Sequence, residues 1–164
     1  MHVLERLERR HLYSPLTIAV ARVLLPKLVS LGGDYTYYTY LDNALKIKLL
    51  SPRGEWLGTI ALIGDRVIVE LPFMKVLPLL RQYEAYVYRH VPSFQRKLFI
   101  SSPVLMYRPS EEKLIIDLLE FLQACRKVAP PIRAGLESSM RLMLAEIAPL
   151  LVELYDYYKK ILPI

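Results

Sequence analysis

Cations and aromatic rings gather between positions 73 and 108, and these are the residues best suited to binding chemistry. This segment has six Lys and Arg against one acid, whereas residues 34–72 have four against five and residues 109–164 have seven against eight. Most of the chain's net charge of +6 therefore lies in one segment. Cations neutralise phosphates and ring faces stack on bases, so the pattern predicts contact with nucleic acid. The predicted contact residues are Lys75, Arg81, Tyr86, Arg89, Arg96, Lys97 and Arg108.

Two other interpretations of this segment stay open. A positive surface also complements an acidic partner protein, and arginine stems and tyrosine rings often cover apolar surface within one chain. The helix that begins at Phe73 is expected to bury its leucines, including Leu77, and to point Lys75, Tyr86 and Arg89 outward. The residues expected to extend this surface are Lys46, Lys48, Tyr35 and Tyr37.

The rest of the sequence lacks the arrangements that catalysis requires. The three histidines have no second His or Cys at metal-ligand spacing, and Cys125 falls on the apolar stripe of a predicted helix. Asp65 and Glu70 flank a predicted strand, as the acids of some metal-dependent nucleases do, but strand alternation puts them on opposite faces. Glycine-rich phosphate loops and nucleophile-elbow motifs are absent. The sequence therefore predicts a protein that is not an enzyme and that holds no metal and no cofactor.

Periodicity and turn signals predict the elements that position these residues. Residues 1–33 are helical in pattern, with a kink or an early end expected at Pro26. Between 34 and 72, alternating apolar runs separated by Asp-Asn, Ser-Pro-Arg-Gly and Gly-Asp turns predict a four-stranded antiparallel meander. Helix returns at Phe73, and residues 94–108 are expected to be irregular or to hold a short strand at 98–100. Whether that strand joins the sheet stays open.

The C-terminal third is predicted to be helical. One helix is expected to open at Pro109–Glu112, with Leu114, Ile115 and Leu118 on its apolar stripe. A last helix has apolar residues at alternating spacings of four and three, although Pro149 interrupts it. Packing within the chain is the favoured explanation of this seam, and contact with a second copy or a partner helix is the alternative. The predicted interface residues are Leu136, Met140, Met143, Ile147, Leu150 and Leu154.

Length and composition predict the fold class and the domain organisation. The 164 residues, 54% of them hydrophobic, predict one α+β domain over 1–164, with about five helices and the meander inserted after the N-terminal helices. Its expected parts are N-terminal helices (1–33), the meander (34–72), a basic aromatic helix and loop (73–108) and a helical hairpin (109–164). One Asn, three Gln, one Cys and twelve Pro are typical of thermophilic proteins.

These observations predict a cytoplasmic protein, because the lone thiol fits a reducing compartment and the sequence has neither a secretory signal nor an apolar run of about 20 residues. No membrane partner is expected. The function predicted first is a non-catalytic nucleic-acid-binding protein, a small subunit of a nucleoprotein assembly. The alternative is a protein-interaction or oligomerisation module, with a helical interface and an acidic protein partner.

Overall fold

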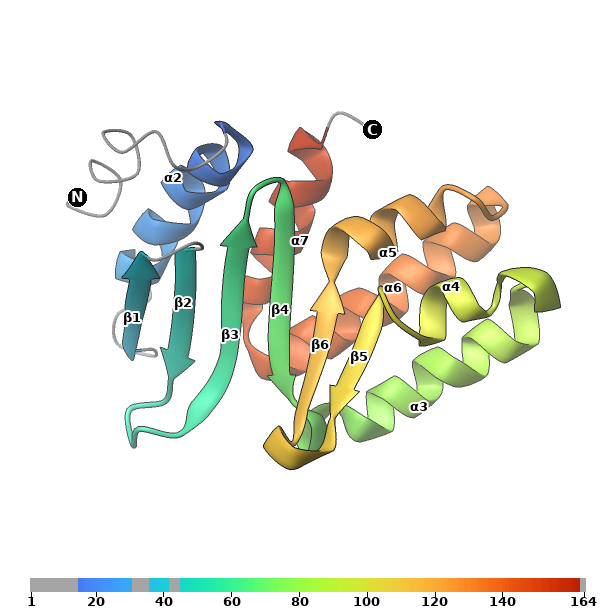
Figure 1. The fold of residues 1–164 in the computed structure, drawn as a ribbon, viewed down its shortest axis with the longest axis horizontal. Helices are drawn as coiled ribbons and strands as arrows, with labels where there is room; N and C mark the ends of the chain where they lie inside the picture. Colours follow the sequence, from blue (N-terminus) through green and yellow to red (C-terminus); the bar gives the residue numbers. More distant parts are fainter. Residues whose placement is uncertain (1–14, 31–35, 42–44, 163–164) are drawn as a thin grey trace.

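The α+β class predicted from the sequence is confirmed by a computed structural model that describes residues 15–30, 36–41 and 45–162. Its sheet has six antiparallel strands in the order β1-β2-β3-β4-β6-β5 (Figure 1). Helices α6 (Pro130–Ile147) and α7 (Pro149–Ile161) cover one face of this sheet. Helix α2 (Pro15–Ser30) packs beside α7, and α3 (Phe73–His90) packs beside α6. On the opposite face no described helix covers the strands, and side chains such as Lys46 and Arg66 are exposed.

The predicted meander is present in the first four strands. They are β1 (Thr36–Leu41), β2 (Leu45–Leu50), β3 (Trp56–Ile63) and β4 (Arg66–Pro72). The apolar residues that alternate along β2 and β4 are buried on the helix-covered face, and Leu49 and Val69 are completely buried. Gly64 turns the β3–β4 hairpin with φ at 59°, a conformation that other residues adopt at a cost.

Two further strands lie beyond the meander, and here the sequence prediction was wrong. The chain forms β5 (Leu105–Arg108) and β6 (Lys113–Asp117), not a helix opening at Pro109–Glu112. Strand β6 pairs with β4, so that Ile116 lies opposite Val69. Leu114, Ile116 and Leu118 alternate as in a strand, whereas Leu114, Ile115 and Leu118 fit a helical stripe. The unpaired edge of β4 decides between the two patterns. Residues 98–100 do not join the sheet, because Lys97–Ile100 forms the short helix α4.

Asp117 marks the change from strand to helix. Its side chain accepts a hydrogen bond from the backbone N–H of Glu120 at 3.2 Å, which caps α5 (Leu118–Cys125). The same carboxylate accepts a hydrogen bond from the guanidinium of Arg66 at 2.8 Å. The cap therefore also joins the start of α5 to strand β4.

Prolines inside two helices do not end them. Helix α2 (Pro15–Ser30) continues through Pro26, and α3 (Phe73–His90) continues through Pro78. Pro149 does end one: the predicted last helix is two helices, α6 (Pro130–Ile147) and α7 (Pro149–Ile161), with Ala148 extended between them. A proline has no N–H to donate and restricts the residue before it to extended backbone, so it begins a new helix here.

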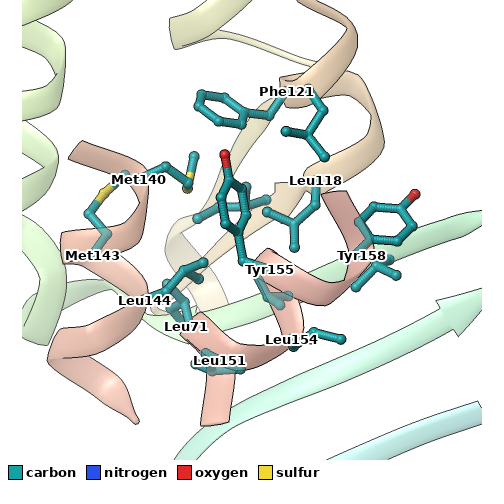
Figure 2. Close-up of a cluster of buried hydrophobic side chains, with 14 of the residues drawn as sticks. Leu71, Leu118, Phe121, Met140, Met143, Leu144, Leu151, Leu154, Tyr155 and Tyr158 are labelled. Carbon is teal, nitrogen blue, oxygen red and sulfur yellow. The ribbon is translucent and has the colours of Figure 1, made fainter. Parts of the chain in front are cut away.

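The heptad seam lies inside this chain. Leu136, Met140 and Met143 are completely buried, and Figure 2 shows methionines of α6 facing Tyr155 of α7 and Phe121 of α5. Leu150 and Leu154 are also buried, and Ile147 is half-buried against the core. All six side chains belong to the hydrophobic core or pack against it, so the predicted interface with another chain does not agree with their burial.

A buried carboxylate ties α6 to α7. Glu137 is 9% exposed and accepts a hydrogen bond from the hydroxyl of Tyr155 at 2.7 Å. Its other partner is the ammonium of Lys159, which lies 2.8 Å from the same oxygen and 3.0 Å from the second one. Because both oxygens of the carboxylate have partners, Glu137 is tolerated next to an apolar core.

Candidate nucleic-acid interface

Helix α3 presents one apolar face to the core and one polar face to solvent. Its buried residues are Val76, Leu80, Tyr83 and Val87. The hydroxyl of Tyr83 donates to the carbonyl oxygen of Phe99 at 2.7 Å, which joins α3 to α4. With this face fixed inward, helical spacing points Arg81, Tyr88 and Arg89 outward, and all three are exposed.

Tyr86 does not lie on the outer face, contrary to the sequence prediction. The residue is half-buried, and its hydroxyl donates to the carbonyl oxygen of Ile132 at 3.4 Å. A side chain at Gly135 of α6 would overlap the Tyr86 ring, so the glycine makes room for it. The exposed tyrosine is Tyr88, at 54%. The buried face is centred on Val76 and Tyr83 instead of Leu77, and this rotation turns Tyr86 towards α6 and leaves Tyr88 exposed.

Three segments meet at the C-terminal end of α3 (Figure 1). The chain leaves α3, forms the turn η1 (Ser93–Gln95) and enters α4, and the connection from α5 to α6 lies beside this turn. The side chain of Gln95 donates to the carbonyl oxygen of Lys127 at 2.8 Å, which fixes the two together. We call the cations gathered here the basic end; they are Arg89, Arg96, Lys97, Arg126 and Lys127.

The basic end has no acidic counterpart. Residues 85–110 and 121–136 contain no Asp and no Glu, and within the described part of the chain none of its five cations forms an ion pair. Several cations elsewhere are paired: Arg66, for example, contacts two carboxylates, of Asp117 and Glu120, at 2.8 and 2.9 Å. The basic end therefore has an uncompensated positive potential.

Two exposed aromatic rings accompany these cations. Phe94, in η1, is 82% exposed, the highest value among the described large hydrophobic residues. The guanidinium carbon of Arg96 lies 5.5 Å from the centre of the Tyr88 ring, within the range of a cation–π contact. The Nε of Arg96 also donates to the carbonyl oxygen of Val91 at 3.2 Å. The basic end thus combines two exposed aromatic rings with cations that form no ion pair to a described carboxylate.

The seven residues predicted to contact nucleic acid do not form one continuous strip. Arg89, Arg96 and Lys97 lie in the basic end, and Arg81 is two helical turns before it. Lys75 is about 21 Å from Arg89 along the helix axis, at 1.5 Å per residue. Arg108 lies in β5, and its guanidinium is 3.8 Å from the carboxylate of Glu111.

The proposed extension onto the meander lies on a different part of the molecule. Lys46 and Lys48 are in β2, far from α4 in Figure 1, and their register partners in β1 are Tyr40 and Tyr38. The register partner of Tyr37 is Leu49. Tyr35, also named in that prediction, lies outside the described residues.

Sequence reasoning missed Arg126 and Lys127. Their segment, 109–164, is slightly acidic as a whole, so a count of charge by segment conceals two adjacent cations at the end of α5. A search for stretches free of acids would have found residues 121–136. It would not have placed them beside α4, because that contact depends on the fold.

The two acids considered for a nuclease site, Asp65 and Glu70, do not form a metal site with the other residues that the structure describes. Asp65 lies in the exposed β3–β4 turn, and Glu70 in β4 forms an ion pair with Lys113 at 3.1 Å. Among the described residues, no group of three or more His, Cys, Asp or Glu is placed to hold a metal ion. None of the described helices has the length and apolar character that crossing a membrane requires.

Cys125 is predicted to be chemically inert in the folded protein. The residue is 1% exposed, and burial raises the pKa of its thiol to about 12, with the nearby charge of Glu137 adding to the effect. At pH 8 the native thiol is therefore protonated and inaccessible. We expect no reaction with an aromatic disulfide reagent under native conditions and one equivalent of thiol released after unfolding in urea. Rapid native labelling at pH 8 would contradict the buried position.

Comparison with known proteins gives no match, since no family model, no curated protein and no solved structure is significantly similar to this chain.

Proposed function

We propose that this protein binds nucleic acid through the basic end and acts as a small, non-catalytic subunit of a nucleoprotein assembly. The observation that carries the proposal is the gathering of Arg89, Arg96, Lys97, Arg126 and Lys127 from separate segments, with no ion pair to any described carboxylate. Unpaired cations held close together raise the free energy of the folded protein through repulsion. A polyanion that approaches this end relieves the repulsion, which favours a phosphate backbone as the ligand.

Phosphate binding by these five cations has a defined dependence on salt. Each phosphate neutralised on a single strand releases counterions and changes the slope of log K against log salt by about −0.7. If all five cations make contact, the slope is about −3.5. The cations lie on a fixed framework, since Gln95 and Arg96 both hydrogen-bond to backbone carbonyl oxygens around η1. Binding thus requires little reordering of the backbone.

The test combines two cations that are distant in sequence. In the variant Arg89→Glu/Lys127→Glu, the loss of two phosphate contacts should weaken binding of a 15-nucleotide single strand at least about 25-fold at 100 mM salt. The salt slope should also become less negative by about 1.4. The control is Arg53→Glu/Lys160→Glu, which makes the same change in net charge at exposed positions outside the basic end.

Fluorescence anisotropy over a range of salt concentrations measures both quantities. Equal weakening by the two variants would show that binding responds to net charge alone and would remove the basic end as the site. Polyglutamate, which has carboxylates but no phosphates, serves as the competitor. If polyglutamate displaces the strand at the same concentration of charge, the basic end fits an acidic protein surface, and the nucleic-acid proposal is wrong.

A further inference from the structure

We infer that the basic end takes unpaired bases, so that the ligand is single-stranded nucleic acid with one base stacked on Phe94. This inference rests on the proposed function, because it names the kind of nucleic acid that the same site binds. The inference depends on the exposed aromatic rings beside the basic end, whereas the proposed function depends on the cations of the basic end.

Phe94 presents a ring that the fold itself does not use. Its 82% exposure leaves nearly the whole side chain in water, although a phenyl ring is among the groups that gain most from burial. The backbone of η1 is nevertheless well held, since the N–H of Gln95 donates to the carbonyl oxygen of Pro92 at 2.9 Å. The Gln95 side chain adds a second link, to Lys127. The ring is therefore displayed from a fixed turn.

The position of Phe94 relative to the cations suits a strand of nucleic acid. Arg96 and Lys97 follow it directly in the chain, and the Gln95–Lys127 hydrogen bond brings the second group of cations to the same turn. A phosphate backbone that crosses between these groups would carry its bases past the Phe94 ring. Tyr88, 54% exposed and beside the guanidinium of Arg96, offers a second ring on the same surface.

Stacking requires a free base face, and this selects for single strands. In a duplex each base is covered above and below by its neighbours, so a protein ring reaches a base face only where the bases are unpaired. Stacking of one base on one ring strengthens binding about 5- to 150-fold and depends little on sequence. The structure thus favours unpaired bases without favouring one base over another.

The experiment compares three labelled 15-mers: oligothymidylate, a duplex of the same length, and an abasic strand that keeps the phosphates. Phe94→Ala should weaken binding to oligothymidylate about 5- to 150-fold without a change in salt slope. It should change binding to the abasic strand less than twofold. Phe94→Trp should retain tight binding, and Met74→Ala, which removes another exposed apolar side chain of α3, should bind as the wild type does.

Failure of this inference is distinguishable from failure of the proposed function. The wild type could bind the duplex as tightly as oligothymidylate, or Phe94→Ala could weaken binding to the duplex and to oligothymidylate equally. Either result would show that the basic end binds phosphates without using unpaired bases. The inference is then wrong and the proposed function stands. If none of the three 15-mers shows salt-dependent binding, the proposed function itself is wrong. Because Phe94 is exposed, we expect its variants to have the same melting temperature as the wild type. This measurement serves as the control for folding.

Discussion

Replacing Phe121 with alanine should lower the free energy of unfolding by about 3–5 kcal/mol, the usual cost of removing a buried phenyl ring. Phe121 is completely buried in α5. Its ring centre lies 6.3 Å from that of Tyr83, 6.4 Å from that of Phe99 and 6.4 Å from that of Tyr155. These neighbours belong to α3, α4 and α7, so one cavity would remove contacts from four helices at once. Figure 2 shows Phe121 near Tyr155 of α7.

Urea denaturation followed by circular dichroism measures this loss. Phe121→Leu keeps most of the volume and should cost about 1–1.5 kcal/mol. Leu142→Ala, at a residue 54% exposed on α6, should change stability by less than about 0.5 kcal/mol. A cost for Phe121→Ala as small as that of the Leu142 control would show that these helices do not share a packed core.

Raising the pH from 8 to 11 should destabilise the fold by about 7 kcal/mol. Burial is the main cause that raises the pKa of Cys125 to about 12 and that raises the pKa of Tyr83, Tyr155 and Tyr158 above the usual value for tyrosine. In the unfolded chain the thiol loses its proton near a pKa of about 8.5 and the phenols near about 10. Above these values the unfolded state binds fewer protons than the folded state, so stability falls as pH rises.

This stability is complete below about pH 8.5 and is lost first through the thiol, then through the phenols. Each group contributes about 1.4 kcal/mol per pH unit above its unfolded pKa. The control is Cys125→Ala, which should delay the onset of the decline to about pH 10 without removing it. Urea denaturation of the wild type and of Cys125→Ala at half-unit pH steps measures both declines in stability. An unfolding free energy that stays constant from pH 8 to 10.5 would contradict the burial of these four groups.

Local signals explain which parts of the fold were predictable. The meander was predicted correctly because Ser51–Gly54 and Gly64-Asp65 mark its turns and because apolar residues alternate along β2. The strand β6 was not, since Leu114, Ile115 and Leu118 also satisfy a helical period. Its conformation depends on pairing with β4, whose residues lie about 45 positions earlier in the chain, as for Glu70 and Ile115.

The candidate site also has residues that the sequence predicts and residues that only the fold brings to it. Arg89, Arg96 and Lys97 were predicted from composition, because a local excess of charge is visible without a structure. Tyr86 was misplaced because its neighbours allow two apolar faces one residue apart, and the space above Gly135 in α6 selects between them. Lys127 was missed because its approach to α4 depends on the hydrogen bond from Gln95.

The order of strands in the sheet has a consequence for folding. Strands β1 to β4 form from local hairpins, whereas β6 must close a loop of about 45 residues before it reaches β4, and such non-local pairings form slowly. Until then, Val67, Val69 and Leu71 belong to an open edge strand with unpaired backbone groups. During synthesis, the nascent chain therefore carries an aggregation-prone edge from the time β4 emerges until residues 113–117 have left the ribosome and paired with it.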